Sequence, residues 1–386
     1  MTKSSGSISF VLPCLNEEGT LGAVLQKIRQ VCASDFADRR TEVIVSDNGS
    51  TDNSHTIAES YGARTLLCPQ RGYGAALQHG IQAATGDIVI FADADGTYDA
   101  SEAPGLVQEL ERGFDLVVGS RLHGTIHKGA MPRLHRYLGT PALTFLLNLL
   151  YARHGNRILD CNSGFRCFRR EAFHTWGVSS PGMEFASEML IKALKAGAKV
   201  SNVPVSLHPD SAGRVPHLKR WRDGMRHLLQ IFLESPGFFW ASGLGLFSVS
   251  WLVILLGVFV GQLSVGVAVV FGLHSMLFAL LGTLFGITLW STGLFLAARS
   301  TTTVRIYRYL VDLPEDVLFW GSVLTGLLSV GLLAAVVIHW AARGFHQIYI
   351  QEQTLAIVAF AADGMLIVSN VITAHLLKAS TYKPHT

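Results

Sequence analysis

Aspartates follow two apolar runs in the first hundred residues, and their spacing suits the binding of a cation and a charged ligand. Asp93 and Asp95 stand two residues apart directly after one apolar run, and Asp47 follows another. Hard divalent cations take oxygen ligands and are often held by one or two carboxylates together with substrate phosphates. We therefore expect a divalent cation at Asp93 and Asp95, and hydrogen bonds from a base or ribose at Asp47.

These aspartates lie within a regular alternation of strand and helix signals over the first 120 residues. Such alternation predicts an α/β, Rossmann-like domain with a mostly parallel sheet covered by helices. Ligands of such sheets bind beyond the carboxyl ends of the strands, where every candidate group lies. Gly72-Tyr73-Gly74 opens one expected helix, and helix N-termini favour anions. Strands are expected at 7–13, 42–47, 63–68, 87–93 and 115–120, and helices at 17–31, 52–61, 73–84 and 101–112.

The charged residues are unevenly distributed along the 386 residues. Residues 1–237 hold 48 of the 59 charged side chains, and residues 238–386 hold 11. The net charge of +3 gives no global basic field, so no nucleic-acid partner is expected. Five cysteines without a C-x-x-C pair predict reduced, buried thiols. The composition excludes a single soluble globule and indicates a soluble domain followed by a membrane domain.

The second half predicts an all-α domain of four transmembrane helices, at about 238–260, 273–298, 317–341 and 354–377. Residues 238–298 contain no Lys, Arg, Asp or Glu, which is enough for two spans of about 20 residues each. Arg299, Arg305 and Arg308 follow the second span, whereas the opposite loops hold only Arg343. The positive-inside rule then places both chain ends in the cytoplasm, and the N-terminal residues show no signal-peptide pattern. We expect a multi-pass protein of the cell inner or plasma membrane with a cytoplasmic catalytic domain.

Two further segments have the pattern of helices at a membrane surface. Residues 214–236 predict a basic interfacial helix between a domain at 1–213 and the membrane domain at 237–386. Its apolar positions recur at helical spacing, and Arg222, Arg226 and His227 belong to the opposite face. Residues 142–152 are apolar but too short to span, so they form either a second interfacial helix or ordinary core.

Asp363 lies near the middle of the fourth expected span. A carboxylate inside a membrane is a candidate functional group, although a polar contact between packed helices is the more economical interpretation here.

Six motifs, in this order and spacing, resemble the family 2 glycosyltransferases of the glycosyltransferase-A fold. Within these, the chain resembles the polyprenyl-phosphate glycosyltransferases, and the resemblance covers about residues 7–235. The motifs are VLPCLNEE, VSDNGSTD, QRGYGAAL, FADADGTYD, VVGSR and DCNSGFRCFRR.

The resemblance implies a nucleotide-sugar donor bound with Mg2+ or Mn2+. Asp93 and Asp95 would hold the cation on the donor diphosphate, with Thr97 at the position of a third ligand. Asp95 thereby also counts as catalytic. The residues that would line the donor pocket are Pro13, Leu15, Glu17, Asp47, Ala92, Asp93, Ala94 and Asp95.

The resemblance also implies an anionic lipid acceptor. Arg121 matches an arginine that contacts phosphate, while Arg136 and Arg133 compete for a second such role. A loop that normally reads G-E-S-K-L departs from the family pattern here. Arg214, His217 and Lys219 therefore remain alternatives for a further lipid-phosphate cation.

The sequence thus predicts an inverting enzyme that moves one hexose from a UDP- or GDP-linked sugar to undecaprenyl or dolichyl phosphate, for glycan or protein glycosylation. Arg121 and Arg136 would neutralise the acceptor, and Glu188 either orients the sugar or acceptor or is a solvated or helix-capping carboxylate. One alternative is a glycolipid or polysaccharide synthase with a hydroxyl acceptor, although the chain lacks the processive Q-x-x-R-W motif. Another alternative is a non-catalytic transport or assembly module. The sequence leaves the oligomeric state open, a homo-oligomer included.

Overall fold

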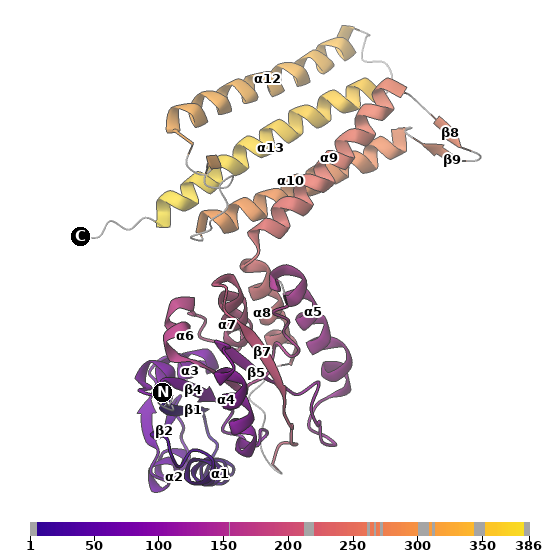
Figure 1. The fold of residues 1–386 in the computed structure, drawn as a ribbon. Helices are drawn as coiled ribbons and strands as arrows, with labels where there is room; N and C mark the ends of the chain where they lie inside the picture. The colour runs from indigo at the N-terminus through magenta and orange to yellow at the C-terminus, as the bar shows by residue number, and fades with distance from the viewer. Residues whose placement is uncertain are drawn as a thin grey trace. The chain divides into compact units, whose positions relative to one another are not determined.

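The computed structural model describes residues 6–153, 155–211, 220–260, 263–265, 268–270, 273–299, 309–310, 313–342 and 352–381. The chain forms two compact units, Met1–Ile231 and Phe232–Thr386. Figure 1 labels the helices and strands of both units.

The first unit is built on a seven-stranded, mostly parallel sheet. The sheet order is β3-β2-β1-β4-β6-β5-β7, and only β6 runs antiparallel to its neighbours β4 and β5. This confirms the predicted α/β, Rossmann-like class. The strands are β1 (Ile8–Cys14), β2 (Thr41–Asp47), β3 (Arg64–Leu67), β4 (Ile88–Phe91), β5 (Leu116–Ser120), β6 (Arg166–Arg169) and β7 (Val200–Pro204).

Helices cover both faces of the sheet because the strand residues alternate between two cores. On β4, Ile88 and Ile90 belong to one core, and Val89 and Phe91 belong to the other. The first core is covered by α1 (Leu21–Ser34), α2 (Ser54–Ser60) and α4 (Ala103–Glu111), the last preceded by the short helix η1 (Ala100–Glu102). The second is covered by α3 (Tyr73–Ala83), α5 (Thr140–Tyr151), α6 (Arg170–Trp176) and α7 (Phe185–Lys195).

The helix expected at 17–31 begins four residues later, at Leu21. The preceding residues are instead fastened to the loop after β2, where Glu17 N–H donates to Ser54 Oγ at 2.9 Å and Glu18 N–H donates to Asp52 at 3.0 Å. Backbone donors that are engaged in this way leave Glu17 in a turn at the sheet edge. The helix start was therefore predicted too early, but Glu17 still lies at a strand end.

The segment at 142–152 is both core and exposed surface. It lies within α5, which follows the π-helical turn η2 (His135–Gly139). Leu147 and Tyr151 are buried in the second core, whereas Phe145 and Leu149 are 67% and 64% exposed. One face of the helix is therefore ordinary core, and the other has the exposed apolar surface expected of an interfacial helix.

The basic helix, α8 (Arg220–Leu233), packs against the first unit through a face that the sequence did not single out. Asp223, His227 and Ile231 are buried, while Met225 and Leu229 of the apolar stripe are more than half exposed. His227 Nδ1 lies 2.6 Å from Ser187 Oγ of α7, and the Tyr151 hydroxyl donates to the carbonyl of Ile231. His227, which the sequence grouped with Arg222 and Arg226, is therefore buried against a polar partner, whereas the two arginines are exposed. Figure 1 shows α5, α7 and α8 together.

The second unit contains four long apolar helices, as predicted. They are α9 (Pro236–Val260), α10 (Leu273–Arg299), α12 (Glu315–Ala342) and α13 (Glu352–Thr381). Each is long and apolar enough to cross a membrane. Around the turn expected near 261–266, the described residues form an antiparallel pair of short strands, β8 (Leu263–Val265) and β9 (Ala268–Val270).

Asp363 lies at the junction of three of these helices. Its carboxylate accepts hydrogen bonds from Trp251 of α9 at 2.8 Å and from Thr283 of α10 at 3.2 Å. Asp363 therefore makes a polar contact between packed helices, which was the interpretation that the sequence favoured.

Candidate functional site

The carboxyl ends of β2, β1 and β4 lie side by side and bring the predicted donor residues together. Cys14 at the end of β1 pairs with Asp47 at the end of β2. On the other side of β1, Val11 pairs with Phe91, two residues before Asp93. Parallel strands therefore gather Pro13, Leu15, Glu17 and Asp47 at the edge where Ala92 to Asp95 follow β4.

Each donor-side carboxylate is oriented by hydrogen bonds from its own loop. Asp47 Oδ1 accepts from the N–H of Ser50 at 2.8 Å and from the Ser50 hydroxyl at 2.7 Å. Asp95 Oδ1 accepts from the N–H and hydroxyl of Thr97, at 3.0 and 2.7 Å. Glu17 accepts from the Thr20 hydroxyl at 3.1 Å. The predicted ligand Thr97 thus holds Asp95 in this structure.

Asp93 is half-buried and is approached from two sides. The Tyr73 hydroxyl donates to Asp93 Oδ1 at 2.8 Å, and an added Cβ on Gly164 would be only 2.3 Å from Asp93 Oδ2. Burial raises the pKa of Tyr73 and the negative charge of Asp93 raises it further, so the phenol remains a donor.

The donor-side residues fit a hard divalent cation. Two carboxylates, Asp93 and Asp95, follow one strand end, and the described ranges contain no cluster of three or more His, Cys, Asp or Glu that could hold a metal ion. Mg2+ in particular is usually bound by one or two carboxylates, with substrate phosphates and water completing the coordination.

Arg121 is paired with a carboxylate that the sequence did not single out for it. Its Nε and Nη2 donate to the two oxygens of Asp160, at 2.7 and 2.8 Å, and its backbone N–H donates to Asp160 as well. Burial lowers the pKa of Arg121, but the negative charges of Asp160 and Asp93 outweigh it and the pKa is raised. Arg121 is therefore a permanently charged group that Asp160 already partly neutralises.

A groove of about 510 Å3 lies beside this ion pair. Arg136, Arg157 and His123 contribute cationic or polar groups to it, and neither guanidinium has an ion-pair partner among the described residues. Tyr137 and Phe145 contribute exposed aromatic surface. The lining is completed by Leu122, Pro141, Thr144, Asn148, Ile158 and Leu159. Such a groove combines positive charge with apolar surface.

The remaining predicted acceptor cations are not gathered here. Arg133 is exposed and does not line the groove. Arg214, His217 and Lys219 lie outside the described residues.

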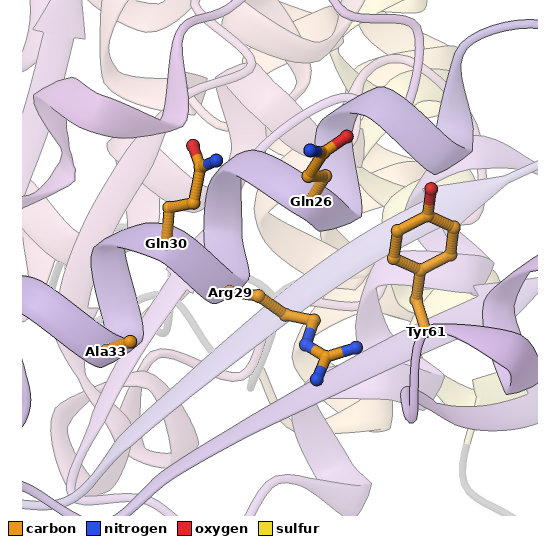
Figure 2. Close-up of a pocket in the computed structure, with 5 residues that line it drawn as sticks. All are labelled: Gln26, Arg29, Gln30, Ala33 and Tyr61. Carbon is orange, nitrogen blue, oxygen red and sulfur yellow. The ribbon is translucent and has the colours of Figure 1, made fainter.

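A second hollow, of about 380 Å3, lies away from the carboxylates. Figure 2 shows Gln26, Arg29, Gln30 and Ala33 of α1 beside Tyr61, and none of them belongs to the sheet edge described above.

Comparison with known proteins agrees with these features. Residues 9–177 match the family model described as glycosyl transferase family 2. The low-salt glycan biosynthesis hexosyltransferase Agl6 of Haloferax volcanii is 35% identical over 355 residues, covering 88% of this chain and 81% of Agl6. The chain belongs to glycosyl transferase family 2.

Another relative of this family 2 glycosyltransferase is named after a lipid phosphate. The dolichyl-phosphate hexose transferase of Haloferax volcanii is 33% identical over 202 residues, which cover 51% of this chain and 81% of the relative. Among solved structures, glucosyl-3-phosphoglycerate synthase from Mycobacterium tuberculosis in complex with Mn2+, UDP and glucosyl-3-phosphoglycerate has a TM-score of 0.49. The two sequences are 25% identical, and the match covers 60% of this chain and 81% of the synthase chain.

Glu188 of the glycosyltransferase is a buried, fully engaged carboxylate. It is 2% exposed, forms an ion pair with Lys192 at 2.6 Å, and accepts from the N–H groups of Ser179 and Ser180. Burial raises the pKa of Glu188, but the hydrogen bonds from Lys192 and Ser180 outweigh it and the pKa is lowered. The alternative of a solvated carboxylate is wrong, since these partners enclose it.

Four groups of this site were missed from the sequence: the Tyr73 hydroxyl, Asp160 as the partner of Arg121, and Arg157 and His123 in the groove. The QRGYG and DCNSGFR motifs contain the first two, but only the fold shows which side chains they meet. Arg157 and His123 belong to none of the motifs, and no sequence signal would have found them.

Proposed function

We propose that this glycosyltransferase transfers one hexose from a nucleotide sugar to a polyprenyl phosphate at a membrane surface. The observation that carries the proposal is the position of Arg121. The negative charge of the donor-side carboxylate Asp93 contributes to the raised pKa of Arg121, and its chain neighbours Leu122 and His123 line the groove. An anionic acceptor bound there would be held close to the donor. The name of the dolichyl-phosphate hexose transferase supports the same acceptor class.

On the donor side, Asp47 and Glu17 would bind the nucleoside, beside Pro13 and Leu15. Asp93 and Asp95 would hold Mg2+ or Mn2+, flanked by the buried Ala92 and Ala94. The cation supplies positive charge that stabilises the leaving nucleoside diphosphate. Thr97 and Tyr73 would keep the two carboxylates in place by the hydrogen bonds that they already form.

On the acceptor side, the reacting atom is a phosphate oxygen. A phosphate monoester has a second pKa near about 6, so at neutral pH the oxygen is a nucleophile without a general base. It attacks the anomeric carbon of the sugar as the bond from that carbon to the diphosphate oxygen breaks. A single in-line displacement of this kind inverts the anomeric configuration.

The groove supplies what a lipid phosphate needs. Arg136, Arg157 and the free edge of His123 would hold the phosphate, since guanidinium groups bind phosphate oxygens through paired N–H groups. Tyr137 and Phe145 would cover the first prenyl units. Arg121 would contribute charge rather than its full set of donors, because Asp160 occupies Nε and Nη2.

The exposed apolar faces of α5 and α8 support a position at the bilayer interface. Phe145 and Leu149 on α5 and Met225 and Leu229 on α8 are each more than half exposed. Helices that combine such residues with arginines bind anionic membrane surfaces. We propose that residues 1–213 form the catalytic domain, 214–236 the interfacial helix and 237–386 the membrane domain, with the catalytic domain in the cytoplasm.

The test uses the purified full-length protein in detergent with radiolabelled UDP- and GDP-hexoses and Mn2+. We expect label in a lipid-linked phosphodiester when undecaprenyl or dolichyl phosphate is present, with inverted anomeric configuration. Label transferred to a polyprenol or a diacylglycerol instead would support the hydroxyl-acceptor alternative and contradict the proposal.

The matched control is Asp93→Asn, which keeps the shape of the side chain but removes its charge. We expect the variant to lose roughly a thousandfold in rate, because a cation clamp contributes several kcal/mol and each tenfold corresponds to about 1.4 kcal/mol. An unchanged rate would exclude the proposed cation site.

A further inference from the structure

Tyr73 is the side chain that contacts Asp93 from the second core of the sheet. Its hydroxyl donates to Asp93 Oδ1 at 2.8 Å. On the other side of the carboxylate, the backbone at Gly164 approaches so closely that a Cβ would be 2.3 Å from Oδ2. Gly164 N–H donates to the Tyr98 hydroxyl at 2.8 Å, which holds that backbone in place. Asp93 is therefore held between a phenol and a segment that cannot carry a side chain.

The start of α3 fixes Tyr73 from the donor side of the site. Gly72 has a φ of 137°, and its N–H donates to Asn48 Oδ1 at 2.7 Å. Asn48 in turn donates through its side chain to Gln70 O and through its backbone to Cys14 O. The loop before Tyr73 is thus tied to the ends of β1 and β2.

The start of α3 is fixed on its other side by the segment before α7. A Cβ on Gly72 would be 2.1 Å from Pro181 O, and Ala75 N–H donates to the same carbonyl at 2.9 Å. Glu188 holds the neighbouring Ser179 and Ser180 through their N–H groups. Two independent attachments therefore place the phenol, so its position does not depend on Asp93.

We propose that Tyr73 is a positioning residue for the cation site: its hydroxyl fixes the orientation of the Asp93 carboxylate before the cation binds. The inference rests on the proposed function, in which Asp93 is a cation ligand. Hydrogen bonds to ligating carboxylates orient them, and their loss typically lowers metal affinity about 10- to 100-fold. Without the hydroxyl, the Asp93 carboxylate loses the hydrogen bond that Tyr73 donates to Oδ1.

The test measures Mn2+ binding rather than turnover. The full-length protein in detergent is titrated with Mn2+ alone, and again with UDP or GDP, while electron paramagnetic resonance follows free Mn2+. We expect Tyr73→Phe to raise the Kd for Mn2+ about 10- to 100-fold. Tyr61→Phe, which removes a hydroxyl from the same unit away from the carboxylates, leaves the Kd unchanged (Figure 2).

Two further measurements separate positioning from folding. The unfolding midpoint of Tyr73→Phe without Mn2+ should stay close to that of Tyr61→Phe, and the Mn2+ concentration for half-maximal activity should rise while KM for the lipid acceptor does not. Gly164→Ala tests the other side of the carboxylate, and we expect it to weaken Mn2+ binding too. Equal Mn2+ affinity in Tyr73→Phe and the wild type would overturn the positioning role alone, whatever the effect of Gly164→Ala. A wild-type protein that binds no Mn2+ would instead overturn the cation site of the proposed function.

Discussion

The donor and acceptor sides of the site are organised differently. On the donor side, Asp47, Asp93 and Asp95 each accept a hydrogen bond that fixes the carboxylate before any ligand binds. On the acceptor side, Arg121 is held by Asp160, whereas Arg136 and Arg157 are exposed at the edge of a groove and have no ion-pair partner among the described residues. The donor side thus resembles a preformed site for a soluble ligand, and the acceptor side an open one for a lipid.

The largest expected effect comes from breaking the ion pair of Arg121 and Asp160 on the acceptor side. Asp160→Asn leaves Arg121 buried without its counter-charge, and breaking a buried ion pair costs about 3–5 kcal/mol. We expect a correspondingly lower free energy of unfolding in denaturant titration of the full-length protein. Glu111→Gln is the matched control, because Arg39 and Glu111 form a similar two-bond pair at the surface. Surface ion pairs contribute little to stability, so a similar loss of unfolding free energy in both variants would contradict a special role for the Arg121–Asp160 pair.

A smaller effect tests the open part of the acceptor side. The double change Arg136→Ala and Arg157→Ala should raise KM for polyprenyl phosphate about tenfold, equivalent to about 1.4 kcal/mol, with KM for the nucleotide sugar unchanged. Arg133→Ala should alter neither constant, because Arg133 does not line the groove. A larger effect from Arg133 would assign the phosphate to a different place.

The third effect is the pH dependence of the stability that Glu188 contributes through its hydrogen bonds to the segment before α7. Glu188 has a lower pKa in the folded protein than in the unfolded chain. Its contribution to stability is therefore complete above the unfolded pKa, about 4.3, and is lost as pH falls through the folded pKa. Glu188→Gln should flatten the acid side of a plot of unfolding midpoint against pH. The exposed Glu171→Gln should leave that slope as it is.

The smallest effect lies in the apolar unit. Asp363→Leu removes both hydrogen bonds to Trp251 and Thr283 and should lower the unfolding midpoint, since such contacts in membranes are worth about 0.6–2 kcal/mol. Asp363→Asn keeps two polar atoms and should lose less. Equal midpoints for the leucine variant and the wild type would show that the junction adds no stability.

The sequence predicted the donor side better than the acceptor side for a physical reason. Parallel strands bring their carboxyl ends to one edge, so residues after β1, β2 and β4 must meet once the strands are recognised. Asp160 meets Arg121 through a connection of 39 residues that no periodicity describes. Helical spacing could not predict which face of α8 is buried either. Asp223, His227 and Ile231 recur every four residues as regularly as Met225 and Leu229 do.

The junction at Asp363 also constrains the order in which the apolar unit can be completed. Trp251 and Thr283 precede their common partner by 112 and 80 residues. During synthesis, α9 and α10 are therefore made while the indole N–H and the threonine hydroxyl still lack the carboxylate that they later share. The two helices can associate early, but their hydrogen bonds to Asp363 form only after α13 has been made. A ribosome stalled before residue 363 would hold α9 and α10 with the indole N–H of Trp251 and the hydroxyl of Thr283 still lacking this acceptor.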